Sequence, residues 1–154
     1  MPFLFLRLWA LPIKILFYRA KPGKEPNMAK FFINLSNHRN MGEAQLAAAE
    51  SFGTVADYPF PNVPTNATVE EIGRMADKVV SDIETTYGTG PDITVMVMGE
   101  MTLVYSLVAR LQAKQIRCVV ACTERKTVER QLADGTIEKT SVFDFAGFRE
   151  YETL

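Results

Sequence analysis

The polar run Ser36-Asn37-His38-Arg39 is the part of this 154-residue chain whose residue types are best suited to chemistry. It contains the chain's only histidine, and an imidazole exchanges protons near neutral pH. Arg39 adds a permanent cation beside it. The run directly follows the apolar segment 31–35, which has the composition of a β-strand. Because open α/β sheets bind ligands beyond the carboxyl ends of their strands, a functional site is expected to begin here.

The elements that position this run are predicted from hydrophobic patterning. Strands are expected at residues 30–35, 54–58, 92–98 and 117–122. A β-hairpin is expected to follow, with arms at 128–132 and 136–145 joined by a turn at 133–135.

Three helices are predicted between the strands. The first is expected to be capped by Asn40 with Glu43 three positions later, and the second to open at the capping box 68–71. The third is expected to follow the turn 99–102. The apolar stripe of the second helix is Val69, Ile72, Met75, Ala76, Val79, Val80 and Ile83. The sum is βαβαβαβ plus a hairpin, which predicts a small Rossmann-like α/β fold with a mostly parallel sheet and helices on both faces.

Composition excludes several classes of function. The formal charge of −1 gives no attraction to duplex DNA, long RNA or an anionic membrane. Cys118 and Cys122 are the only cysteines, and we expect two reduced core thiols in a cytoplasmic protein. No dinucleotide fingerprint, phosphate loop or nucleophile elbow occurs, and no residues have metal-ligand spacing. We therefore expect no cofactor, and any catalysis to be independent of metal.

Residues 1–27 differ in character from the rest of the chain. They form an apolar leader interrupted by Arg7, Pro12 and Lys14, followed by a linker of turn-forming composition. One interpretation is an over-extended start, with translation beginning at Met28. The alternative is a segment that binds a membrane surface or a partner. Residues 28–154 are expected to form the Rossmann-like domain.

Four predicted loops meet at the carboxyl edge of the sheet. They are Ser36-Asn37-His38-Arg39, Pro59-Phe60-Pro61-Asn62, Gly99-Glu100-Met101-Thr102 and Thr123-Glu124-Arg125-Lys126. The first and third lead into helix N-termini, which attract anions, so the set fits a phosphorylated nucleotide. Each member also has a purely structural interpretation, as a turn residue, a helix cap or a solvated hairpin charge.

The chain resembles the small stand-alone CRISPR-associated Rossmann-fold (CARF-like) proteins of type III CRISPR systems, from Met28 to Tyr151. The resemblance rests on Asn34-Leu35-Ser36-Asn37-His38, Pro59-Phe60-Pro61, Met98-Gly99-Glu100-Met101-Thr102, Cys122-Thr123-Glu124-Arg125 and Phe148-Arg149-Glu150-Tyr151. Members of this group bind cyclic oligoadenylate second messengers, and some are ring nucleases that degrade them. The resemblance implies antiviral defence, a homodimer or higher homo-oligomer, and cyclic tetra-adenylate as the first ligand to consider.

The resemblance also implies roles for residues. A ribose 2′-hydroxyl would attack the neighbouring phosphodiester and leave a 2′,3′-cyclic phosphate, with His38 as acid or base. Arg39 or Arg125 would contact the phosphate through paired donors. The residues predicted to be catalytic are His38 and Arg39, and those predicted to bind ligand are Ser36, Asn37, Gly99, Glu100, Thr102, Thr123, Glu124 and Arg125.

Two other functions stay open at this point. The chain could bind the messenger without cleaving it, because its catalytic equipment is modest. It could instead be a protein-interaction domain that pairs its hairpin, residues 128–145, with the edge of a partner. A conventional nucleotide-processing enzyme comes last, since the phosphate and acidic motifs of such enzymes are missing.

Overall fold

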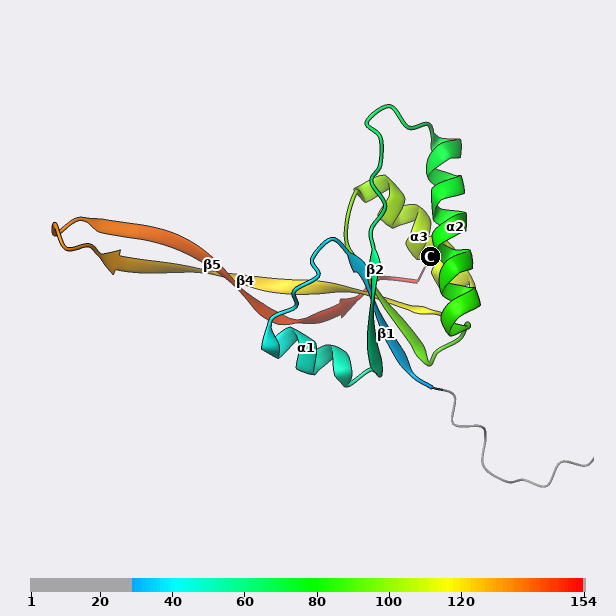
Figure 1. The fold of residues 1–154 in the computed structure, drawn as a ribbon, viewed down its shortest axis with the longest axis horizontal. Coiled ribbons are helices and arrows are strands. Elements are labelled where there is room, and N and C mark those ends of the chain that lie inside the picture. Colours follow the sequence, from blue (N-terminus) through cyan, green and yellow to red (C-terminus); the bar gives the residue numbers. More distant parts are fainter. Residues whose placement is uncertain (1–28, 154) are drawn as a thin grey trace, which may run out of the picture.

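The strands of this protein form one five-stranded sheet in the computed structural model, which describes residues 29–153 (Figure 1). The elements are β1 (Phe31–Ser36), α1 (Glu43–Glu50), β2 (Thr54–Pro59), α2 (Val69–Tyr87), β3 (Ile93–Val97), α3 (Met101–Ala113), β4 (Arg117–Gln131) and β5 (Ile137–Glu150). The strand order is β2-β1-β3-β4-β5, in which β5 alone runs antiparallel. The predicted α/β class, with a mostly parallel sheet and a C-terminal hairpin, is confirmed. The predictions for residues 1–27 lie outside the described residues.

The strand order sets which helix covers which face of the sheet. The chain moves outward from β1 to β2, then crosses back over β1 to β3, so right-handed connections put α1 on one face and α2 with α3 on the other. The α2/α3 face holds the larger apolar core, and α1 covers a smaller cluster of Phe32, Ala49, Met96 and Val119. The reversal between β1 and β3 creates a switch point, where doubly wound sheets place ligands.

Local sequence signals account for most of these elements. The capping box of α2 is confirmed, because the Thr68 hydroxyl accepts from the Glu71 amide and the Glu71 carboxylate accepts from the Thr68 amide. Two details were wrong. The N-cap of α1 is Gly42 rather than Asn40, because the loop after β1 runs two residues further before turning into helix. Val69 is 84% exposed and does not join the apolar stripe, which begins at the buried Ile72.

The hairpin is much longer than predicted. β4 does not stop at Cys122 but continues to Gln131, and β5 pairs with it from Ile137 back to Glu150. The last β4 residue paired with β3 is Val119, so the outer part of the hairpin projects from the domain (Figure 1). No helix in the described part of the chain is long and apolar enough to cross a membrane.

The burial of Cys118 leads to a test of the core. Burial raises the pKa of its thiol to about 12, and the thiolate is the reactive form. We expect Cys118 to react with iodoacetamide at least about 100-fold more slowly in the folded protein than in urea-unfolded protein. Mass spectrometry of the labelled peptides measures both rates, with the half-buried Cys122 as an internal comparison. Equal rates for Cys118 in the two states would contradict its burial.

Candidate functional site

A buried polar network supports the loop after β1. Asn34 and Ser36 are almost fully buried, and the Asn34 carboxamide nitrogen donates to the His38 carbonyl (2.9 Å) and to Asp57 Oδ1 (2.8 Å). The Ser36 hydroxyl donates to Asn34 Oδ1 (2.6 Å) and accepts from the His38 amide (3.1 Å). Both backbone groups of His38 are therefore held, while its side chain lies exposed. The network fixes where the loop leaves the sheet.

The loop lies at the switch point of the sheet. The Met98 amide donates to the Leu35 carbonyl (3.1 Å), which keeps the ends of β1 and β3 side by side. On the other side of β1, a pocket of about 260 Å³ opens beside β2. Its lining includes Ser36, Arg39 and Asp57, so a guanidinium and a carboxylate face one small volume. This pocket, together with the loop 37–42, is the candidate site.

The sequence-predicted residues at the start of α3 have a structural role. The Glu100 carboxylate accepts from the amides of Thr102 (3.1 Å) and Leu103 (2.9 Å) and from the Thr102 hydroxyl (2.6 Å). Glu100 is therefore the N-cap of α3, and its own negative charge occupies the place where a phosphate was expected. Gly99 lies against the buried ring of Phe60, so it too has a packing role.

The cap makes a prediction about acid stability. The pKa of the Glu100 carboxyl lies below its ordinary value, first through the Thr102 hydroxyl and then through the two amides. A lowered carboxyl pKa stabilises the fold above the unfolded value of about 4.3 and loses that effect as pH falls. Glu100→Gln should therefore lower Tm at pH 7 and differ less from the natural chain at pH 3. Thermal denaturation followed by circular dichroism checks this, and an equal Tm difference at both pH values would contradict it.

The predicted residues on β4 do not join the candidate site. Thr123, Glu124 and Arg125 belong to the projecting hairpin, beyond the last residue of β4 that pairs with β3. Arg125 donates to the Ser141 hydroxyl across the hairpin from Nε (3.0 Å) and Nη2 (2.8 Å). The expectation that these residues sit in a loop at the edge was wrong, because the strand simply continues.

Three residues of the site were missed in the sequence. Asn34 interrupts the apolar run 31–35 of β1, and it is in register with Asp57 on β2. Tyr58 also lines the pocket, and its hydroxyl donates to Asp82 (2.7 Å). Burial, and then that bond to Asp82, raise the pKa of Tyr58 to about 12, so Tyr58 is a neutral donor at physiological pH. The signal in the sequence that could have indicated the network is an asparagine in the middle of an apolar strand.

Metal binding has no support in the described residues. Within 29–153, no group of three or more His, Cys, Asp and Glu side chains could hold a metal ion. The groups that the site offers are the exposed imidazole of His38, the guanidinium of Arg39 and the carboxylate of Asp57. These groups can transfer a proton and pair with an anion.

Comparison with known proteins gives a family. A family model described as the uncharacterized protein MJ1673 family matches residues 30–149. The chain belongs to this family. No curated protein and no solved structure matches the chain.

The family match covers every residue of the candidate site and both strands of the hairpin. It begins at the residue before β1 and ends one residue before the end of β5. The site and the hairpin are thus parts of the MJ1673 family domain itself. The resemblance to CRISPR-associated proteins stays a prediction.

Proposed function

We propose that this protein binds a cyclic oligoadenylate second messenger, with cyclic tetra-adenylate as the first candidate, in type III CRISPR antiviral signalling. The observation that carries the proposal is the hydrogen-bonded network that the buried Asn34 and Ser36 form with Asp57. It holds the backbone of His38, the residue before Arg39, at the end of β1, although the side chains of His38 and Arg39 are exposed and add nothing to the core. A network of this kind is expected where a loop must present side chains to a ligand.

The ligand class follows from the chemistry of the pocket and from the family resemblance. Arg39 can pair with a phosphodiester through two donors, and Asp57 can accept from a ribose hydroxyl or an adenine amino group. Ser36 is already engaged in the network, which makes it a positioning residue rather than a ligand contact. Asn37, whose side chain is exposed on the loop, is better placed to reach the ribose-phosphate backbone.

Cleavage of the messenger is the second part of the proposal. The 2′-oxygen attacks the adjacent phosphorus, the bond from phosphorus to the 5′-oxygen breaks, and a 2′,3′-cyclic phosphate and a 5′-hydroxyl result. His38 accepts the 2′-hydroxyl proton or delivers a proton to the leaving 5′-oxygen. Arg39 stabilises the charge on the phosphorane. As in the enzymes that the chain resembles, two copies would meet one two-fold symmetric ligand.

Sequestration without cleavage is the second candidate function. It is favoured by Glu100, whose carboxylate accepts from the first amides of α3. Those amides are therefore not free to stabilise the negative charge of a phosphorane. A single exposed histidine and one arginine would then serve binding more than turnover. This version predicts tight binding with intact ligand after hours of incubation.

The test uses the full chain, without metal, and radiolabelled cyclic tri-, tetra- and hexa-adenylate. Native gels report binding, and denaturing chromatography reports linear products. Arg39→Ala should weaken binding at least about tenfold, whereas Arg74→Ala, the same change on the exposed surface of α2, should not. His38→Ala should abolish the products and retain the gel shift.

Each outcome decides between the candidates. Linear products that depend on His38 support a ring nuclease, and a shift with intact ligand supports sequestration. No shift with any of the three ligands at micromolar protein would overturn the proposed function. Equal loss in the Arg39 and Arg74 variants would show non-specific charge attraction instead of a site.

A further inference from the structure

The outer part of the β4–β5 hairpin, residues 123–145, is here called the arm. Its two strands pair with each other as far as Gln131 and Ile137, while the pairing of β4 with β3 ends at Val119. At about 3.3 Å per residue, the arm reaches roughly 30 Å from the sheet. A two-stranded ribbon alone is marginally stable in water, so the arm needs a surface to pack against.

The arm carries apolar side chains in a position where a monomer would expose them to water. Ile137 near its tip is 61% exposed and Phe143 on its β5 strand is 63% exposed. Other large apolar side chains exposed along the arm are Val128, Leu132 and Val142. In the register of the ribbon, Ile137 and Phe143 share one face, and Val128 and Val142 share the other. Exposed large apolar side chains that recur in this way are typical of an interaction site.

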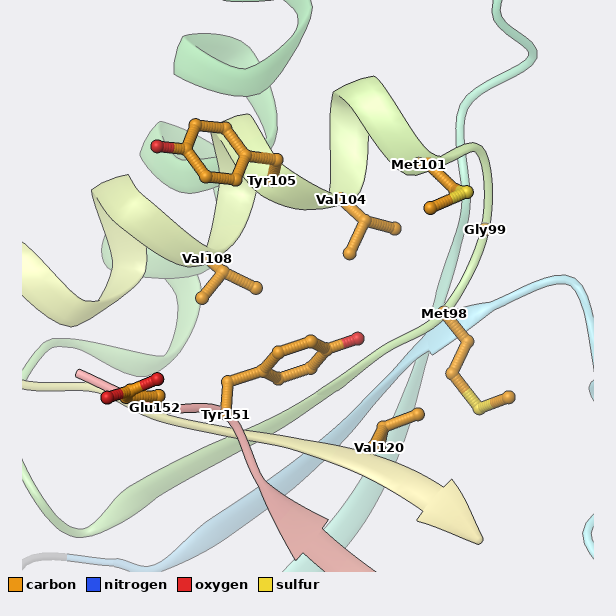
Figure 2. Close-up of a pocket in the computed structure, with 9 residues that line it drawn as sticks. All are labelled: Met98, Gly99, Met101, Val104, Tyr105, Val108, Val120, Tyr151 and Glu152. Atoms are coloured by element: carbon orange, nitrogen blue, oxygen red, sulfur yellow. The ribbon is translucent and has the colours of Figure 1, made fainter. Parts of the chain in front are cut away.

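A second uncovered apolar surface lies at the foot of the arm. It is a groove of about 450 Å³ between α3 and β4, lined by Met101, Val104, Tyr105, Val120 and Tyr151 (Figure 2). Tyr151 is fixed there because its hydroxyl donates to the Val97 carbonyl (2.9 Å). Met101 and Tyr105 are 82% and 67% exposed. Since a hairpin rather than a helix joins β4 to β5, no helix of the described chain covers this groove.

We propose that the arm and the groove form one interface between two copies of this chain. The two arms lie antiparallel, and the tip of each arm fills the groove of the other copy. The geometry follows from the position of the groove, because Val120 precedes the arm by only three residues. Two arms of equal length that pack antiparallel about a two-fold axis bring each tip to the foot of the other. The interface needs no nucleotide and is independent of the proposed function.

The charge of the arm favours a second copy over a nucleic acid. Residues 123–145 contain four Lys and Arg and five Asp and Glu, so the arm gives no net attraction to a polyanion. Several of these charges are already paired within the arm, Lys126 with Asp144 (2.9 Å) and Lys139 with Glu129 (2.7 Å). An arm with balanced charge meets its own copy without repulsion between like charges.

The areas of the arm and of the groove explain why the proposed interface uses both. One face of a ribbon roughly 30 Å long and about 10 Å wide offers on the order of 300 Å². That is less than half of the ~800 Å² per partner that stable interfaces bury. Seating the tip in the groove adds apolar contact at each end of the paired arms. The surface of the arms alone is too small for a stable dimer.

The experiment measures the mass of the full chain, without nucleotide, by sedimentation and native mass spectrometry. The natural chain, at 17.3 kDa per copy, should form a dimer at micromolar concentration. Ile137→Lys at the tip and Tyr105→Lys in the groove should each raise the dimer Kd at least about tenfold. Leu46→Lys is the matched control, because Leu46 is an exposed apolar residue on α1, outside both surfaces, and should leave the dimer intact.

Mixing the two variants tests whether the tip and the groove touch. An Ile137→Lys chain paired with a Tyr105→Lys chain keeps one natural tip in one natural groove, so the hybrid should form where each variant alone is monomeric. The proposal is overturned by a natural chain that is monomeric at about 100 μM. It is also overturned by a dimer that survives both substitutions, by a mixture that stays monomeric, or by association that requires added RNA.

Discussion

Asn34→Leu is expected to lower the free energy of unfolding by about 2–3 kcal/mol, because it removes the three hydrogen bonds that Asn34 makes in the buried network. The Asn34 carboxamide makes two bonds as donor and accepts one from Ser36. Leucine has the same branched shape, so the loss does not come from a large cavity. The Ser36 hydroxyl loses its acceptor on Asn34 instead, and the His38 carbonyl and the Asp57 carboxylate each lose a donor. Urea denaturation followed by circular dichroism measures the change.

The matched control is Asn62→Leu, the same substitution at an exposed position in the loop after β2. It should change the free energy of unfolding by less than about 0.5 kcal/mol. Asn34→Leu should also weaken binding of cyclic tetra-adenylate at least about tenfold at a temperature where the variant is fully folded, since His38 and Arg39 lose their support. An Asn34→Leu variant as stable as the control would show that the network does not hold the loop.

The parts of the fold that were predicted correctly depend on neighbours in sequence. The capping box of α2 joins residues three apart, and the apolar runs of β1 and β3 mark strands that are covered on both faces. The hairpin was underestimated for a physical reason. Where both faces of a ribbon meet water, no apolar alternation is required, so Glu124, Arg125 and Lys126 looked like a loop.

The candidate site was predictable in place but not in its chemistry. The position of His38 and Arg39 after the first strand follows from topology, which the sequence pattern indicated. The support from Asp57 depends on the register of β2 against β1, a relation between residues 23 positions apart that no local pattern reports. Glu100 was ambiguous for a different reason. An acidic residue before a helix can be an N-cap or a ligand contact, and only its hydrogen bonds to the first amides of α3 identify it as the cap.

Gly99→Ala is expected to lower the free energy of unfolding by about 1–3 kcal/mol, because its methyl group would overlap a buried aromatic ring. A Cβ at this position would lie 2.4 to 2.6 Å from three ring carbons of Phe60. Phe60 is 5% exposed and packs within the core of the α2/α3 face, so the ring has little room to move. Gly42→Ala is the control for steric overlap alone, since a Cβ there would meet nothing within 4 Å and any loss reflects the N-cap of α1. Urea denaturation of both variants gives the comparison.

A second substitution separates packing from ligand contact at Gly99. Phe60→Leu removes the ring carbons that a methyl group would strike, so the double variant should recover part of the loss, with a coupling of about 1 kcal/mol or more. Strictly additive losses would show that the contact with Phe60 is not the cause. Gly99 and Phe60 both belong to segments on which the resemblance to CRISPR-associated proteins rests. Their packing against each other can account for both residues without a ligand. If binding of cyclic tetra-adenylate returns together with stability in the double variant, Gly99 acts by packing, and the ligand is recognised at the loop after β1.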